Sequence, residues 1–501
     1  MQEKLDDLKK RLAEISDIHN AAALLGWDQQ TYMPPGGAAA RARQLATLSQ
    51  IAHEKFTDDA IGCLLNALHA HAHSLPYDSD DASLIRVTKR EYDKARRLPP
   101  ALVSEIAYAS AQAFESWRKA RNESRFCDFA PYLQRILELK IRYAGYLGYT
   151  DRIYDPLLDE FEPGMKTAQV EAIFANVKKE IVPLVHAISS KLHEVDNSFL
   201  HQDFHEDKQW DIGVEVARLI GYAFERGRQD RSPHPFTTSF SRDDVRITTR
   251  FMPDYFPAAF FATIHETGHA LYNQGLRHEL ERTPLADGAS LGAHESQSRL
   301  WENLIGRSRS FWKFFMPRVQ AVFPEQFRNV NAEKMYRAVN RVQPSLIRVE
   351  ADEITYNLHI MIRFELENAL LEGRLAVSDL PDAWNTRMQE YLGITPPDDA
   401  HGVLQDVHWS HGSFGYFPTY SLGNIFASQL FDQIKKDISG LDTYFEKGEF
   451  HILLDWLRAN LHIHGRKFTL DELANKITGE SLQTHSFTAY LKNKYGEIYN
   501  L

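Results

Sequence analysis

The segment from His265 to His269 has the residue types and the spacing of a metal site with its own base. Residues four apart lie on one face of a helix, so the two imidazoles can converge on one divalent ion. Glu266 follows the first histidine by about 100° of helical rotation, which places its carboxylate beside the ion rather than on it. A carboxylate there can take the proton of a metal-bound water. The segment therefore predicts hydrolysis with Glu266 as general base.

A buried helix must position these side chains. Residues 256–272 are apolar almost all the way round, which is typical of a helix that packs on every side. Pro257 suits its first turn and Gly275 its end. Because unpaired polar groups are costly in such a setting, the two histidines favour a functional site over an incidental pair.

The third metal ligand must come from another element. A metzincin would need glycine at position 272 and histidine at position 275, where this chain has Tyr272 and Gly275, so that class is excluded. Residues 287–303 predict a turn followed by a helix, which suits an antiparallel return past the first helix. This helix offers Glu295 as the third ligand. Glu302, two turns further along the same face, is the alternative.

A change of hydrophobic period before the metal helix predicts a β-hairpin. Residues 234–240 and 245–251 are rich in β-branched and aromatic side chains, with a turn at 241–244. An exposed edge strand here could align an extended peptide by strand addition. The alternative is a hairpin that only caps the helix.

A glycine-rich segment at residues 395–423 predicts a loop that serves the site. Its His408, Tyr416 and Tyr420 are candidate donors for the oxyanion of a tetrahedral intermediate. The alternative is that each of these side chains only satisfies local hydrogen bonds.

The rest of the chain predicts a mainly helical fold that begins with one long helix over about residues 2–30. We find no repeat and no flexible linker, so residues 1–501 are expected to form a single domain with two lobes. The net charge of -11 argues against nucleic acid as a partner. No stretch approaches the length of a membrane span, and the start of the chain lacks a signal core, so a cytoplasmic protein is expected. Cys63 and Cys127 are expected to be core thiols.

Together these segments resemble the carboxypeptidase Taq family of metallocarboxypeptidases. The resemblance extends over most of the chain, in the order of the family. It is carried by the metal-site segment and by these stretches: Trp27-Asp28 with Met33-Pro34, Asp244-Val245-Arg246-Ile247-Thr248, His294-Glu295-Ser296-Gln297, Ile347-Arg348-Val349-Glu350-Ala351-Asp352 and Gly402-Val403-Leu404-Gln405-Asp406-Val407-His408-Trp409.

The resemblance implies a two-lobed helical peptidase with a deep active-site cleft, similar in architecture to the neurolysin-like peptidases, and a homodimer. It favours His408 as the oxyanion donor, with a tyrosine such as Tyr420 assisting, and a place for Tyr416 at the substrate. Asp406 would orient an imidazole.

A carboxypeptidase must also hold the terminal carboxylate of its peptide, for which the planar fork of arginine is best suited. Arg348 and Arg246 lie in two of the family-like stretches, with Arg348 preferred. The alternative for Arg348 is an internal ion pair with Glu350 or Asp352.

The predicted function is a metal-dependent carboxypeptidase that acts on peptides. His265, His269 and Glu295 favour zinc, with cobalt or manganese as alternatives. The competing hypotheses are a cytosolic oligopeptidase on the same fold and a non-catalytic scaffold that retains a structural metal. An intact Glu266 and an open fourth coordination position argue against the scaffold.

Overall fold

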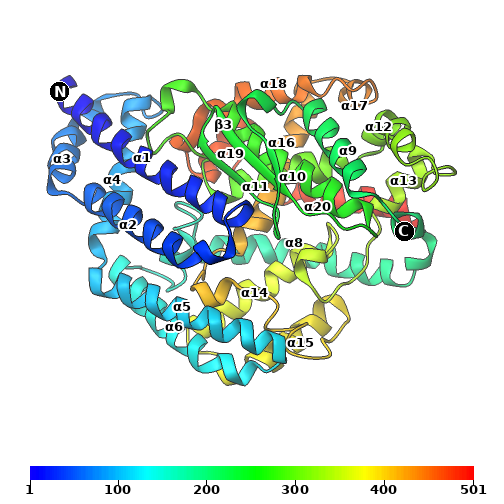
Figure 1. Cartoon of the computed structure of the whole chain (residues 1–501), viewed down its shortest axis with the longest axis horizontal. Helices are drawn as coiled ribbons and strands as arrows, with labels where there is room; N and C mark the ends of the chain where they lie inside the picture. The colour runs from blue at the N-terminus through cyan, green and yellow to red at the C-terminus, as the bar shows by residue number, and fades with distance from the viewer. The chain divides into compact units, whose positions relative to one another are not determined.

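The computed structural model describes residues 1–501 and is mainly helical, with one small sheet (Figure 1). The predicted fold class is therefore confirmed. By its internal contacts the chain forms two compact units: unit 1 comprises residues 1–96, 197–339 and 430–481, and unit 2 comprises residues 97–196, 340–429 and 482–501. That residues 1–501 form a single domain stays a prediction.

Unit 1 begins with the long helix that the leucine spacing predicts. This helix runs from Gln2 to Thr31 and buries Leu5, Leu8 and Leu12 against the next helices. The helices of unit 1 are α1 (Gln2–Thr31), α2 (Ala38–Phe56), α3 (Asp59–Ser74), α4 (Asp80–Arg97), α9 (Glu206–Leu219), α10 (Phe256–Gly275), α11 (Leu291–Arg299), α12 (Arg309–Val322), α13 (Ala332–Val339), α17 (Leu441–Phe445), α18 (His451–Asn460) and α19 (Leu470–Thr478).

The sheet belongs to unit 1 and contains the predicted hairpin. Strands β2 (Thr237–Ser241) and β3 (Asp244–Thr249) pair antiparallel, with Thr237 opposite Ile247. A third strand, β1 (Gln229–Arg231), pairs parallel with β3, so the order is β1-β3-β2. Three residues are too few to show a period of two, which is why β1 was not predicted. Both β2 and β3 pack against α10, the predicted metal helix.

Unit 2 is helical and carries the glycine-rich segment. Its helices are α5 (Pro100–Glu123), α6 (Phe126–Leu147), α7 (Asp155–Leu158), α8 (Thr167–Ser189), α14 (Thr355–Leu371), α15 (Leu380–Leu392) and α20 (His485–Tyr499), with the first part of α16 (Pro418–Asp437). The loop predicted for 395–423 was too long, because α16 already begins at Pro418. Proline is well suited to the first turn of a helix, so it starts this one.

The two cysteines correct a second expectation. Cys63 and Cys127 are exposed rather than core thiols. In α3, Ile61 and Leu65 turn one face inward, and a residue two positions after Ile61 lies on the opposite side of the helix. No helix of the chain has the length and apolar character that a membrane span requires.

Candidate active site

Helix α10 has the bounds that its sequence predicts. Pro257 lies in the first turn, and the helix ends at Gly275. Apart from a few positions such as His265 and His269, its side chains are buried. A helix that is apolar on all faces is held rigidly by its neighbours, which keeps the two imidazoles in place.

Helix α11 returns antiparallel to α10, as the sequence predicts. The contacts run in opposite order along the two segments, because His265 meets Glu302 while His269 meets His294. Gly268 makes this close approach possible. A Cβ atom at position 268 would lie 2.6 Å from the Cα of Ser298, which is shorter than real contacts allow.

The three predicted ligands converge in unit 1. The Oε2 atom of Glu295 lies 3.7 Å from Nε2 of His265 and 3.4 Å from Nε2 of His269. All three ligand atoms lie within 4.8 Å of one another. Ligand atoms about 2.0–2.1 Å from a tetrahedral ion are separated by roughly 3.3 Å, so the donor set fits a single divalent ion.

The carboxylate of Glu295 is prepared for this role by its own helix. Arg299 Nε donates to Oε1 at 2.7 Å, and Ser298 Oγ donates to Oε2 at 3.1 Å. Burial alone would raise the pKa of Glu295, but the charges of Arg299 and His265 hold it well below its usual range. The carboxylate is therefore ionised and directed by one oxygen toward the histidines.

Glu302, the alternative ligand, contacts the other side of His265. Its Oε2 atom accepts a hydrogen bond from Nδ1 of His265 at 2.9 Å, and it also pairs with Arg299 at 3.3 Å and with Arg307 at 3.1 Å. A carboxylate in this place fixes the tautomer and the ring orientation of a ligand histidine. The geometry is consistent with Glu295 as the ligand and with Glu302 as the support of His265.

His269 has a different support, which the sequence did not reveal. With Nε2 of His269 as the ligand atom, its Nδ1–H donates to Nδ1 of His294 at 2.6 Å. His294 in turn donates from Nε2 to Oδ1 of Asn273 at 3.0 Å. Burial and the proximity of His269 lower the pKa of His294 to about 4, so His294 is neutral and can accept this hydrogen bond.

Glu266, the predicted base, lies on the buried side of α10 and contacts the hairpin. The hydroxyl of Thr237, on β2, lies 2.7 Å from Oε2 of Glu266. Burial raises the pKa of Glu266 above its ordinary value, although His265 and the Thr237 hydroxyl oppose this shift. A raised pKa suits a carboxylate that must both take and return a proton near neutral pH. Thr237 was missed because nothing in a strand sequence reveals what its side chain will meet.

Arg246, the second candidate for the substrate carboxylate, lies on β3 in unit 1. Its Nε and Nη2 atoms donate to the two oxygens of Asp244 at 2.8 and 2.9 Å. The guanidinium also lies over the rings of Trp27 and Phe240, at 4.4 and 4.9 Å from their centres. The family-like stretches around Trp27 and Arg246 thus meet in one packed group.

Arg348, the preferred candidate, is almost fully buried in unit 2, with 4% of its surface exposed. Its Nε and Nη2 atoms donate to Oδ1 of Asp406 at 3.1 and 2.8 Å, and Nη1 donates to Tyr356 at 2.9 Å. The ion-pair partner is therefore Asp406, and not Glu350 or Asp352 as the alternative proposed. Asp352 instead accepts from Thr355 within its own turn.

Asp406 joins two buried arginines. Its second oxygen, Oδ2, accepts from Nε of Arg363 at 2.6 Å, and Arg363 also donates to Gln405 at 2.8 Å. Arg363 has no exposed surface. The sequence motifs did not identify Arg363. Its position inside the apolar stretch of α14 is nevertheless a signal of a buried ion pair, because a charge in such a place must be paired.

The imidazole that Asp406 was expected to orient is not bonded to it. Nδ1 of His408 lies 3.8 Å from Asp406 and has no hydrogen-bond partner. Burial lowers the pKa of His408 to about 4, so the ring is neutral and can donate one N–H. The ring of Tyr416 lies 5.3 Å from that of His408, and Tyr420 lies 5.1 Å from the guanidinium carbon of Arg348. Unit 2 therefore gathers four of the predicted site residues.

The central place of Asp406 leads to a stability prediction. Asp406→Ala leaves two buried guanidinium groups without a counter-charge, and breaking a buried pair in this way costs about 3–5 kcal/mol of unfolding free energy. Glu115→Ala is the control, since Glu115 pairs with Arg118 at 2.8 Å on the surface of unit 2. That exposed pair should be worth less than about 1 kcal/mol. Chemical denaturation of both variants measures the difference, and equal small losses would contradict the role given to Asp406.

A mainly helical chain with two histidines four apart, an adjacent glutamate and a second glutamate from the next helix has the features of a metallopeptidase. The comparisons with known proteins agree. The model of the carboxypeptidase Taq (M32) metallopeptidases matches residues 7–495. Carboxypeptidase 1 of Bacillus subtilis is 40% identical over 99% of this chain and 98% of its own. Thermostable carboxypeptidase 1 of Thermus thermophilus is 42% identical over 97% of each chain.

Solved structures give the same result. The M32 carboxypeptidase of Deinococcus radiodurans superposes with a TM-score of 0.96 at 40% identity, covering 100% of both chains. The carboxypeptidase of Pyrococcus furiosus gives 0.95 at 36% identity, covering 99% of both. The chain belongs to the carboxypeptidase Taq (M32) metallopeptidases. The resemblance drawn from its motifs is confirmed, and the enzyme is a metal-dependent carboxypeptidase rather than an oligopeptidase or a scaffold.

Proposed function

We propose that His265, His269 and Glu295 hold one zinc ion and that Glu266 is the general base for hydrolysis of the C-terminal peptide bond. The observation that carries this proposal is the convergence of the three ligand atoms within 4.8 Å of one another, on two rigid antiparallel helices. Two imidazoles and one carboxylate are a ligand set typical of catalytic zinc, and they leave a fourth position open.

The roles of the protein groups follow from their chemistry. The ion, when bound, polarises the scissile carbonyl and activates water. Glu266 takes a proton and returns it to the leaving amine, and the Thr237 hydroxyl keeps its carboxylate in place. His408 donates an N–H to the oxyanion with Tyr420 assisting, and Tyr416 contacts the substrate.

Arg348 holds the terminal carboxylate in this proposal, with Arg246 as the second candidate. A guanidinium has five N–H groups. Three of those of Arg348 donate to Asp406 and Tyr356, which leaves two for a substrate and fixes the plane in which they point. Arg246 already uses its fork on Asp244, which makes it the weaker candidate.

The test compares free-acid peptides with their C-terminally amidated twins. A charge-assisted hydrogen bond is worth about 1.5–3 kcal/mol, so Arg348→Ala should lower kcat/KM for free acids about ten- to hundredfold. Arg348→Lys should lose less, because it keeps the charge but not the fork. Both variants should leave the slow cleavage of amidated peptides nearly unchanged.

A uniform loss on both substrates, with a lower melting temperature, would instead make Arg348 only a structural partner of Asp406. If Arg246→Ala lowered kcat/KM for free-acid peptides only, Arg246 would be the residue that holds the terminal carboxylate.

The cellular setting is also part of the proposal. We place the enzyme in the cytoplasm as a homodimer that acts on peptides. The unpaired, exposed thiols of Cys63 and Cys127 are compatible with a reducing compartment. The homodimer rests on the family resemblance alone.

A further inference from the structure

A surface pocket of about 550 Å³ lies in unit 1 at the C-terminal end of α10, the helix of the metal site. It is lined by Gln274 and Gly275 of that helix and by four arginines. These arginines come from separate segments: Arg226, Arg242, Arg277 and Arg458. The proposed hydrolysis uses none of them.

Two of the arginines are accounted for by their partners. Arg226 donates from Nε to Asp243 at 2.6 Å and from Nη2 to the carbonyl of Gln274 at 2.9 Å, so it satisfies the end of α10. Arg277 is paired with Asp80 through Nη2. The negative end of the helix dipole also attracts these charges.

The other two arginines, Arg242 and Arg458, lack comparable partners. The guanidinium of Arg242 makes no hydrogen bond. Its Nε is buried without a partner and lies 3.7 Å from Asp243, a carboxylate already bonded to Arg226. Arg458 on α18 has only Asp455, at 3.8 Å. Burial lowers the pKa of Arg458, and the like charges of Arg226 and Arg242 nearby act in the same direction.

The acidic groups nearby do not cancel this charge. Glu279 lines the pocket, but its side chain is 71% exposed and lies 4.0 Å from Arg277. Glu281 pairs with His278 at 2.6 Å and accepts from the backbone N–H of Arg242. Guanidinium groups that are partly buried and mutually repelling are costly unless an anion joins them.

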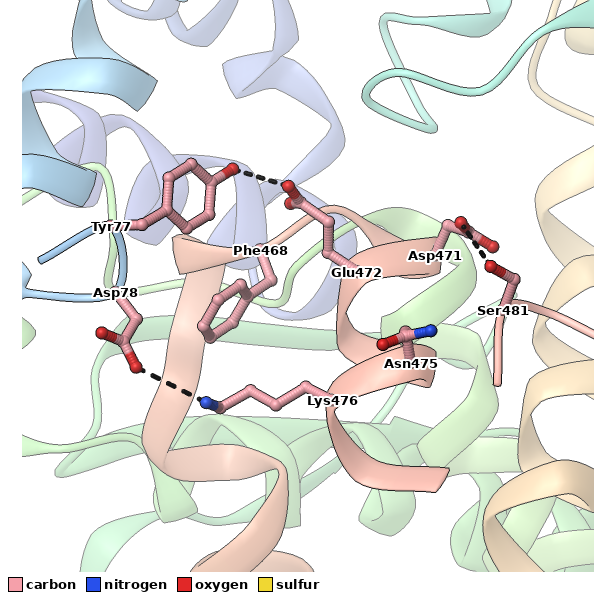
Figure 2. A pocket seen from close by; sticks show the side chains of 8 residues that line it. All are labelled: Tyr77, Asp78, Phe468, Asp471, Glu472, Asn475, Lys476 and Ser481. Carbon is pink, nitrogen blue, oxygen red and sulfur yellow. Dashed lines mark hydrogen bonds and ion pairs between the residues drawn. The ribbon is translucent and has the colours of Figure 1, made fainter. Parts of the chain in front are cut away.

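A second pocket of unit 1 shows the contrast. Figure 2 shows each of its carboxylates turned toward a partner: Asp78 toward Lys476, Glu472 toward Tyr77 and Asp471 toward Ser481. Tyr77 donates to Glu472 at 2.6 Å, and Lys476 pairs with Asp78 at 3.5 Å. Its charged lining consists of three carboxylates and one lysine, so it lacks the excess of cations that marks the arginine pocket.

We propose that the arginine pocket is a binding site for a phosphate group, either free inorganic phosphate or the phosphate of a small phosphorylated molecule. The planar forks of Arg242 and Arg458 match a tetrahedral oxyanion, which can bridge both groups and remove their repulsion. Several cations around one hollow also concentrate anions there. The volume lies within the range of small-molecule sites.

The test is calorimetric titration of the metal-loaded, full-length protein with inorganic phosphate, at constant ionic strength. We expect saturable one-to-one binding that Arg458→Ala and Arg242→Ala each weaken about tenfold or more. Arg318→Ala is the matched control, because Arg318 has the same exposed fraction as Arg458, 37%, but is paired with Glu215 at 3.1 Å. This control should bind phosphate as the wild type does.

Two further measurements separate loss of binding from misfolding and identify the kind of ligand. Without phosphate, Arg458→Ala should melt no lower than the wild type, since Arg458 makes no hydrogen bond, so lost binding cannot be ascribed to misfolding. A phosphate monoester that binds more tightly than inorganic phosphate would identify a phosphorylated molecule as the ligand, and weaker binding would identify free phosphate. Undetectable binding at millimolar phosphate, or binding that survives both arginine substitutions but disappears on metal removal, would overturn the proposal.

Discussion

Replacing Glu266 by glutamine should leave the metal content unchanged and lower kcat by about 10²–10⁴-fold, the usual contribution of a general base. Glutamine keeps the size of the side chain and can still accept from the Thr237 hydroxyl, so the helix pair should not rearrange. It cannot take a proton, however. Metal analysis and steady-state kinetics on the same preparation measure the two quantities independently.

The outcome that contradicts this role is a variant that keeps its metal and turns over within about tenfold of the wild type. Another group would then have to hold the proton. Thr237→Val is a useful companion, because it removes only the hydroxyl that positions Glu266. We expect it to lower kcat by a smaller factor and to leave the metal content alone, which separates positioning from proton transfer.

Replacing Glu295 by alanine should remove stoichiometric metal and activity together, as should His265→Ala and His269→Ala. Loss of one of three ligands leaves too few donors to hold the ion in the open geometry that catalysis needs. Glu302→Ala is the matched control on the same helical segment. It should retain the site but bind the metal about 10–100-fold more weakly, because the three ligands remain while the support of His265 and the pairing with Arg299 and Arg307 are lost.

The measurement is competition with a chelator of known affinity, followed by activity after dialysis against excess metal. Excess metal should restore Glu302→Ala and not Glu295→Ala. Normal metal content in Glu295→Ala, with loss in Glu302→Ala, would reverse the two assignments and make Glu302 the third ligand.

Much of the proposed metal site could be predicted from the sequence, because the signals for it are local. Two histidines four apart on a helix share a face whatever surrounds that helix. Pro257 and Gly275 mark its ends, and the 26 positions from His269 to Glu295 leave room for an antiparallel return in α11. The hairpin of β2 and β3 was predictable for the same reason, since alternation and a turn are properties of neighbouring residues.

What the tertiary structure decided is which side chains meet across long stretches of sequence. The hydroxyl that contacts Glu266 comes from Thr237, 29 positions earlier, and Arg363 meets Asp406 across 43 positions. Neither contact has a periodicity or a spacing that marks it. Such pairs form because buried charges and hydroxyls must find partners, and only the packing of the elements determines which partners are within reach.

The choice between Glu295 and Glu302 shows the boundary between the two kinds of information. Both carboxylates were predicted for one face of one helix, so the sequence reduced the question to two candidates. In the structure Glu295 lies near Nε2 of both histidines, whereas Glu302 bonds Nδ1 of one, and this difference supports the proposal of Glu295 as the ligand. Helical spacing determines the face of a side chain, but the distance between two helices and the orientation of each ring determine which nitrogen it meets.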